Sequence, residues 1–220
     1  MVPVGNPGNA PDTRYDNIPI GYVGYEYQIG KYEVTAGQYT EFLNAVAKAD
    51  PNGLYHPSMG SPSVVLGANI KRTGSAPTFS YSVAADWANR PVNWVSYWDA
   101  ARFANWLHNG QPTGPQDPGT TEGGAYHDVG NQTLFGRNAG AKFFIPTENE
   151  WYKAAYHDQS AGLAASYFDY PTGIKHRADQ HAARSREPRH LQRYLWYRER
   201  WLHNRQPLLS YGSGRVCELG

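Results

Sequence analysis

The amino-acid sequence predicts an α+β fold that is irregular and rich in loops. Three segments carry the start signals and the apolar periodicity of helices, and short strand-like pieces precede them. The 23 Gly and 16 Pro among 220 residues demand many turns. The spacers at residues 50–90 and 109–140 are far longer than the ~4–6 residues of a typical connection, which indicates elaborate surface loops.

Each helical segment opens with a residue that can cap the free backbone N–H groups of a first turn. The segments are EVTAGQYTEFLNAVAK, VSYWDAARFANWLHNG and IPTENEWYKAAYHD. Thr35 with Gln38 and Thr147 with Glu150 fit a capping box, whereas Ser96 caps the second segment and Asp99 takes its third helical position, where the helix dipole favours a negative charge. Gly110 ends the second segment. We therefore expect three helices that begin at these caps.

Each helical segment also carries an apolar stripe. The side chains expected to face inward are Tyr39, Phe42, Leu43 and Val46 in the first, Ala100, Phe103, Ala104 and Leu107 in the second, and Trp151, Ala154 and Ala155 in the third. The small alanines of the third segment predict close packing of that helix.

Three short pieces have the composition of strands. GYEYQIGKYEV alternates apolar and polar residues, RPVNWV places Val92, Trp94 or Val95 on a buried face, and AKFFIP is an apolar run that a proline ends. A strand followed by a capped helix is therefore the recurring pattern.

Segments KYEVTAGQYTEFLNAV, RPVNWVSYWDAARFANWL and FFIPTENEWYKAAYHD resemble, in order and spacing, the first half of the formylglycine-generating enzyme family, also called the sulfatase-modifying factor domain. The resemblance covers about residues 20–173. It implies an irregular, loop-rich fold like that of a C-type lectin, incomplete at its C-terminal side. It also implies a parent activity, the oxidation of a sulfatase cysteine to formylglycine.

Members of this family are expected to carry a cysteine pair that holds copper, together with structural calcium. This sequence has one cysteine, Cys217, and soft thiolate ligands are what select Cu(I). It also lacks the Gly-rich loop and the later tryptophan-containing strands of the family pattern. We therefore assign no catalytic, cofactor-binding or metal-binding residue, expect no cofactor, and do not expect this chain to be an enzyme. If the second half of the domain is missing, the helical stripes should form large exposed apolar patches.

The charge distribution predicts three regions: an extended N-terminal segment at residues 1–19, the family-like domain at 20–173, and a basic tail at 174–220. Residues 1–174 hold 10 Lys and Arg against 15 Asp and Glu, a net charge of −5, whereas residues 175–205 hold 9 against 3, a net charge of +6. Such asymmetry is typical of a basic arm, but it has a second explanation.

We interpret the tail as the product of a frame change near Ile174 or Lys175, or as a disordered segment. Trp is encoded only by TGG, so Trp196 followed by Tyr197, and Trp201 followed by Leu202, would each give a Gly codon in the frame shifted by one base. A polar Gly-rich loop is what the family pattern places after YPTG. The hypothesis is tested by sequencing the coding DNA through and past the codon for Gly220.

Two other interpretations of the tail stay open. RYLWYRERWLHNR interleaves Arg with Trp and Tyr, as binders of single-stranded nucleic acid do. The same stretch could form a basic amphipathic helix on a membrane surface, although its apolar stripe is ragged. We do not expect a nucleic-acid partner. No apolar run approaches the ~20 residues that cross a bilayer, so we expect no membrane span.

Other titratable residues favour structural roles. Glu148 and Glu150 lie two apart in a first turn, where capping explains them better than acid/base catalysis. The histidines lack metal-ligand spacing, so we expect surface or loop hydrogen bonds from His108, His127 and His157. Acidic residues in turn-rich loops could hold calcium, but we assign none of them: Asp12, Asp16 and Asp128.

The sequence leaves three kinds of function. The one we favour is a truncated or non-catalytic member of the family that acts at most as a lectin-like binding or scaffold module for a peptide or a glycan. The alternatives are an active formylglycine-generating oxidase and a nucleic-acid binder that uses its basic tail. No leader segment follows Met1, and the compartment cannot be assigned, although the resemblance implies that full-length relatives can be secreted or periplasmic.

Overall fold

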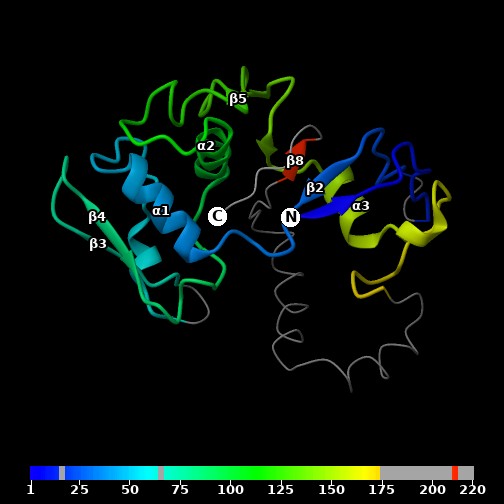
Figure 1. Ribbon diagram of the computed structural model, residues 1–220, viewed down its shortest axis with the longest axis horizontal. Coiled ribbons are helices and arrows are strands. Elements are labelled where there is room, and N and C mark those ends of the chain that lie inside the picture. Colours follow the sequence, from blue (N-terminus) through cyan, green and yellow to red (C-terminus); the bar gives the residue numbers. More distant parts are fainter. Residues whose placement is uncertain (15–17, 64–66, 174–209, 213–220) are drawn as a thin grey trace. The chain divides into compact units, whose positions relative to one another are not determined.

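The computed structural model describes residues 1–14, 18–63, 67–173 and 210–212. The chain divides into two compact units, which are described separately. Among the described residues, the first unit takes Met1 and those within 30–145 and 210–212, and the second takes those within 2–29 and 146–173. Three α-helices and short antiparallel strands make the described part a mixed α+β structure (Figure 1). This confirms the predicted class.

The helices begin where the sequence predicts. They are α1 (Ala36–Val46), α2 (Tyr97–His108) and α3 (Glu148–Tyr156). In each, the cap side chain accepts a hydrogen bond from the third backbone N–H, and the third side chain bonds back to the cap. The two predicted capping boxes and the predicted Ser96 cap are therefore confirmed, and in α2 the side chain of Asp99 completes a third box that was not predicted.

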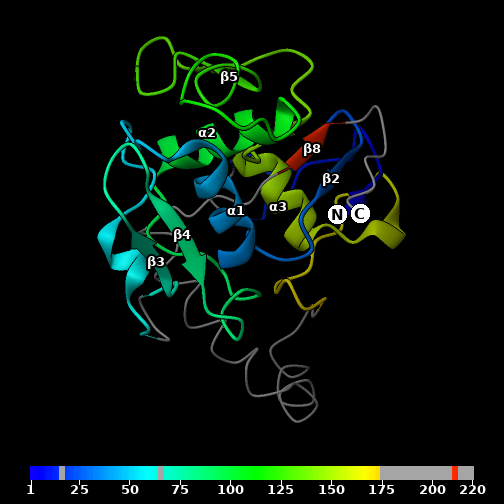
Figure 2. The same ribbon diagram turned by 60° about the vertical axis from the view of Figure 1, so that its left-hand side comes forward.

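The first unit contains three short antiparallel pairs. The strands are β3 (Ile70–Thr73) with β4 (Ser80–Val83), β5 (Tyr126–His127) with β6 (Gly136–Arg137), and β7 (Phe143–Phe144) with β8 (Ser210–Gly212). The unit also contains a 3₁₀ turn, η1 (Pro57–Gly60). Each spacer expected to be loop alone therefore contains a strand pair, and Figure 2 shows the β3–β4 hairpin beside α1.

The second unit contains a strand pair and one helix. β1 (Val2–Val4) pairs antiparallel with β2 (Tyr27–Ile29), and a 3₁₀ turn, η2 (Gln159–Ala161), follows α3.

Two of the three predicted strand pieces are confirmed in shortened form, as β2 and β7. RPVNWV was predicted wrongly as a strand: it makes a single bridge, between Pro91 and Thr35, because Trp94 takes a left-handed backbone conformation that ends the extended run.

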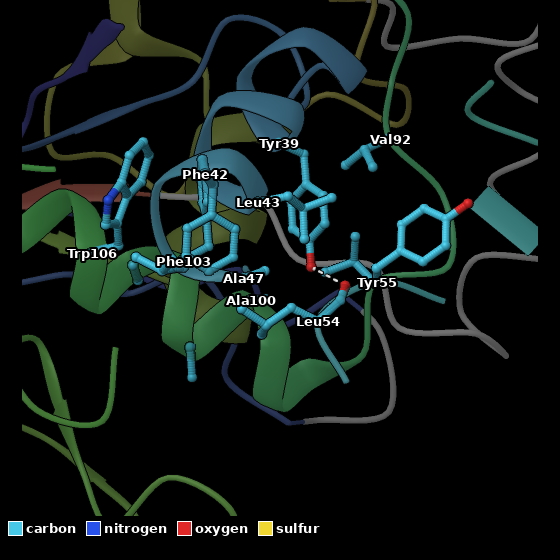
Figure 3. Packing of buried hydrophobic residues seen from close by; sticks show 14 of the residues in the cluster. Tyr39, Phe42, Leu43, Ala47, Leu54, Tyr55, Val92, Ala100, Phe103 and Trp106 are labelled. Atoms are coloured by element: carbon cyan, nitrogen blue, oxygen red, sulfur yellow. Dashed lines mark hydrogen bonds between the residues drawn. The ribbon is translucent and has the colours of Figure 1, made fainter. Parts of the chain in front are cut away.

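The core of the first unit is aromatic and aliphatic (Figure 3). Phe42 of α1 has no exposed surface, and its ring contacts those of Tyr39, Phe103 and Trp106 at centroid distances of 5.4, 5.2 and 5.3 Å. Tyr39 donates its hydroxyl to the carbonyl of Leu54 at 2.9 Å. Such contacts place α1 and α2 in one packed cluster with the 54–55 segment and β4.

The prediction that the apolar stripes of the helices are exposed is wrong for α1 and α2. The four stripe residues of α1 are at most 2 % exposed, and three of the four in α2 are buried. The chain segments that cover them come from the spacer between the two helices, which supplies Leu54, Met59, Ile70 and Tyr81 to the same cluster. A spacer that looked like surface loop therefore provides much of the opposite wall of this core.

Asparagines on α1 and α2 bind strands in the same way. Asn44 donates its amide to the carbonyl of Tyr81 at 2.8 Å and accepts from the N–H of Tyr81 at 3.0 Å. Asn105 does the same with Tyr126, at 3.1 and 2.7 Å. Each asparagine lies nine residues after its helix cap. Each supplies one donor and one acceptor to a strand residue, which satisfies two backbone groups at once.

The interior of the second unit mixes polar and charged side chains with apolar ones. The buried residues of α3 are Glu150, Lys153 and Tyr156, whereas the predicted stripe of Trp151, Ala154 and Ala155 is only half-buried. This prediction was wrong because the segments packed on α3 offer hydrogen-bonding groups. Lys153 donates its ammonium to the carbonyl oxygens of Asn6 and Val23, at 2.9 and 3.4 Å.

The predicted basic tail lies outside the described residues except for β8. Its frame-changed or disordered character and the boundaries at residues 19 and 173 therefore stay predictions. In the part of the chain that the structure describes, no helix has the length and apolarity that crossing a membrane would require.

Candidate binding surface

Aromatic side chains gather around the start of α2 in the first unit. The residues are His56, Trp94, Tyr97, Trp98 and Phe135, which we call the aromatic surface. Trp94 is 41 % exposed and Tyr97 is 42 % exposed, although neighbouring Val92 and Val95 are buried. Within this segment the two valines therefore face the core and the Trp94 ring faces outward.

Trp94 is held by a parallel stack on His56. The two rings lie 4.9 Å apart at an interplanar angle of 9°. His56 caps η1, where its Nδ1 accepts a hydrogen bond from the N–H of Ser58 at 3.2 Å. This bond fixes the orientation of the His56 ring. Trp94 has a φ of +67°, which costs a bulky residue about 1–3 kcal/mol. Strain of this kind is concentrated at functional sites.

The other half of the aromatic surface is a cluster of edge-to-face rings. Phe135 contacts Tyr97 at 5.6 Å and Trp98 at 4.9 Å, with interplanar angles of 72° and 82°. On its other side it stacks on Tyr126 of β5 at 5.0 Å and 9°. Tyr126 is fixed in turn by Asn105. The exposed rings are therefore supported by the strand that α2 binds.

This arrangement suits binding by contact area. Trp and Tyr offer large rigid faces with a polar tip and lose little conformational entropy on binding, which is why they are enriched at interfaces. Rings that are already packed against Phe135 and His56 need little reordering. No site residue was predicted here, although the aromatic residues of NWVSYW are a signal for such a surface.

Of the residues considered as acid/base or metal candidates, Asp16 lies outside the described residues, and the others make the contacts that follow. Glu150 is buried, accepts from the N–H of Thr147 at 2.6 Å and bonds the hydroxyl of Tyr25, while Glu148 is exposed. The preference for capping over catalysis therefore fits the geometry of Glu150. In the second unit Asp12 is 2 % exposed and binds Arg14 at 2.9 Å and the Tyr152 hydroxyl at 2.8 Å. Burial alone would raise the pKa of Asp12, but these partners hold it below its usual range.

The three histidines differ in environment. His127 is exposed and its Nδ1 lies 2.8 Å from the carboxylate of Asp128. His108 accepts the N–H of Lys142 at Nδ1, and burial together with Lys142 lowers its pKa. His157 is 4 % exposed where it ends α3, and of the expected surface or loop hydrogen bonds it makes the loop kind, between Nε2 and the carbonyl of Ala164 at 3.4 Å. The structure brings none of these histidines onto the aromatic surface.

The described residues contain no group of three or more His, Cys, Asp or Glu side chains that could hold a metal ion. Cys217, the one cysteine of the sequence, lies outside the described residues. A copper site built on thiolates needs a pair of them. The donors present therefore do not fit the copper that the resemblance implies.

Comparison with protein families gave one match. The model for the sulfatase-modifying factor enzyme 1-like domain matches residues 17–215, which is most of the chain. The chain belongs to this family. The match confirms the resemblance drawn from the three helical segments, and it places the aromatic surface within a sulfatase-modifying factor-type domain. Searches of curated proteins and of solved structures found no match to it.

Proposed function

We propose that this sulfatase-modifying factor-type domain is a non-catalytic binding module that holds a polypeptide segment on the aromatic surface. The observation that carries the proposal is the exposed Trp94 ring, held in a strained backbone conformation and stacked on His56. A large ring kept exposed at an energetic cost is more consistent with binding than with folding.

The family supports a polypeptide as the ligand. The name of the matched domain describes a factor that modifies a sulfatase, and a sulfatase is a protein. The single cysteine of the 220 residues supports a role in binding without the oxidation chemistry. A lectin-like fold, and with it a glycan ligand, is the other expectation drawn from the resemblance, and the experiment below includes it as an outcome.

The test is a selection from a displayed library of random peptides against the purified chain, followed by affinity measurements on the selected peptides. We expect Trp94→Ala and Tyr97→Ala each to weaken binding on the order of tenfold or more, the loss typical of a central aromatic contact. Tyr22→Ala is the matched control, because Tyr22 is 55 % exposed but lies in the second unit. It should leave the affinity unchanged.

Three results would contradict the proposal. If Tyr22→Ala weakens binding as much as Trp94→Ala, the aromatic surface is not the site. If the chain binds only members of a neutral oligosaccharide panel, the ligand is a glycan. If the purified chain oxidises a cysteine-containing peptide with consumption of oxygen, the module is catalytic.

A further inference from the structure

The sequence contains two Asn-Gly pairs, Asn52-Gly53 and Asn109-Gly110. Glycine after asparagine leaves the peptide nitrogen unhindered, so such pairs are the ones most prone to lose the side-chain amide to water. Both pairs lie in the first unit and in described residues, and their surroundings differ. We propose that Asn52 is a site of spontaneous deamidation and that the change loosens the junction between two loops.

Asn52 is the more accessible asparagine of the two. It is exposed, as are Pro51 and Gly53, whereas Asn109 is half-buried; at both glycines nothing lies within 4 Å of the space that a side chain would occupy. Gly53 has a φ of +68°, and its N–H donates a hydrogen bond to the backbone carbonyl of Asp50 at 3.2 Å. The Asn52 amide nitrogen makes one hydrogen bond, at 2.9 Å, to Oε1 of Glu122. Water and hydroxide can therefore reach the reacting atoms.

Asn109 is held more firmly. It is half-buried at the end of α2, where its backbone N–H bonds the carbonyl of Asn105 at 2.9 Å. Its amide nitrogen donates two hydrogen bonds, to the carbonyls of Thr120 and Gly123 at 3.1 and 2.8 Å. Cyclisation at Asn109 would break both bonds and turn its backbone out of the helical end, so it should react more slowly than Asn52.

The reaction needs only water. The backbone nitrogen of Gly53 gives its proton to hydroxide and attacks Cγ of Asn52, so a C–N bond forms. The Cγ–Nδ2 bond breaks, and Nδ2 takes a proton from water and leaves as ammonia. Water then opens the cyclic imide at either carbonyl, which gives an aspartate or an isoaspartate. No atom is oxidised or reduced.

The product places a new carboxylate in a network of hydrogen bonds. Glu122 already pairs with Arg102 through two bonds of 2.7 and 3.0 Å. The backbone N–H of Asn52 donates to Gln116 at 3.2 Å, and Gln116 donates to Asp50 at 3.3 Å. Replacing the Asn52 donor by an anion opposite Glu122 turns an attraction into a repulsion. The 50–53 turn would then separate from the 115–122 loop.

Peptide mass spectrometry on the intact chain, incubated at mildly alkaline pH and then digested with trypsin, tests the proposal. Cleavage at Lys48 and Lys71 releases residues 49–71, and cleavage at Arg102 and Arg137 releases residues 103–137. We expect the mass gain from exchanging NH for O to accumulate severalfold faster at Asn52 than at Asn109. Equal rates at the two pairs, or faster conversion at Asn109, would overturn the assignment.

Variants separate the reaction from its consequence. Asn52→Gln keeps an amide donor and should abolish the conversion, because glutamine would have to close a larger cyclic imide, which forms far more slowly. Asn52→Asp imitates one product and should lower the melting temperature by several degrees relative to Asn52→Gln. If the two variants melt together, the modification does not loosen the junction and that part of the proposal is wrong.

Discussion

Helix α1 in the first unit and helix α3 in the second begin with the same kind of cap, but they bury different kinds of side chain. Both begin with a threonine cap whose box is completed by the third helical residue. α1 buries Phe42 and Leu43 in an aromatic cluster, whereas α3 buries Glu150 and Lys153 together with Tyr156. The first turn of a helix is therefore set locally, but the face that becomes buried is set by what packs against it.

The two units are stabilised differently for this reason. Burial of apolar surface supplies about 25 cal/mol per Å² and needs no precise partner. A buried charge is tolerated only when its hydrogen bonds are complete. The ammonium of Lys153 donates to two carbonyl oxygens from the first 23 residues, and burial lowers its pKa. The second unit therefore depends on exact partners more than 120 residues away in sequence.

Phe42→Ala should have the largest effect and should act on the first unit. Phe42 contacts three other rings and has no exposed surface, so its truncation leaves a cavity that costs about 3–5 kcal/mol. Urea unfolding and amide exchange in α1 measure the loss. Leu134→Ala, at a position 58 % exposed, is the control and should cost below about 0.5 kcal/mol. Equal losses in the two variants would contradict a packed aromatic core.

Glu150→Ala should be the next largest effect and should act on the second unit. The carboxylate accepts from the Thr147 N–H and from the Tyr25 hydroxyl, and bonds to charged groups contribute about 1.5–3 kcal/mol. Glu148→Ala, in the same first turn but exposed, removes only an interaction with the helix dipole and should cost below about 1 kcal/mol. Amide exchange in α3 distinguishes the two. A larger effect for Glu148 would mean that the buried acid is dispensable.

The asparagine pair gives a smaller difference within one unit. Asn105 is fully buried and bonds Thr121 as well as Tyr126, so Asn105→Ala leaves buried groups without partners and should cost about 1–3 kcal/mol. Asn44→Ala exposes the equivalent groups of Tyr81 to water and should cost about 1 kcal/mol or less. Denaturant midpoints measured for both variants compare the two. Equal midpoints would show that burial does not set the value of this contact.

Much of the fold was predictable from the sequence because its signals are local. The three capping pairs lie within four residues, and the stripe of α1 repeats at helical spacing. The face of α3 was not predictable, because the acceptors of Lys153 lie in Asn6 and Val23. A hydropathy pattern assigns Lys153 to the surface and cannot register carbonyl oxygens that arrive from a distant segment.

The candidate surface shows the same limit. RPVNWV indicates that some of its apolar residues are buried, but the choice among Val92, Trp94 and Val95 depends on the positive φ of Trp94 and on the stack with His56. Residues 50–90 were read as loop because of their Gly, Pro and Ser content, although they hold β3 and β4. The alternation of SYSV was the available signal, and it is only four residues long.

The smallest expected effect concerns His157. The pH dependence of stability tests how this buried histidine contributes to the second unit. Burial lowers the pKa of His157 below its usual value of about 6.5, so the unfolded chain binds a proton at a higher pH than the folded unit does. Its contribution to stability is therefore complete above about pH 6.5 and is lost as the pH falls from there through the lower folded pKa. Neither ring nitrogen has a carboxylate partner in the described residues: Nε2 meets the carbonyl of Ala164 at 3.4 Å, and Nδ1 is buried without a hydrogen bond.

His157→Gln removes the titration, so the stability of the second unit should fall less between pH 7 and pH 5 than in the parent chain, as measured by amide exchange in α3. An unchanged fall would mean that protonation of His157 is not coupled to folding of this unit, and His108→Gln, which alters the first unit, provides the comparison.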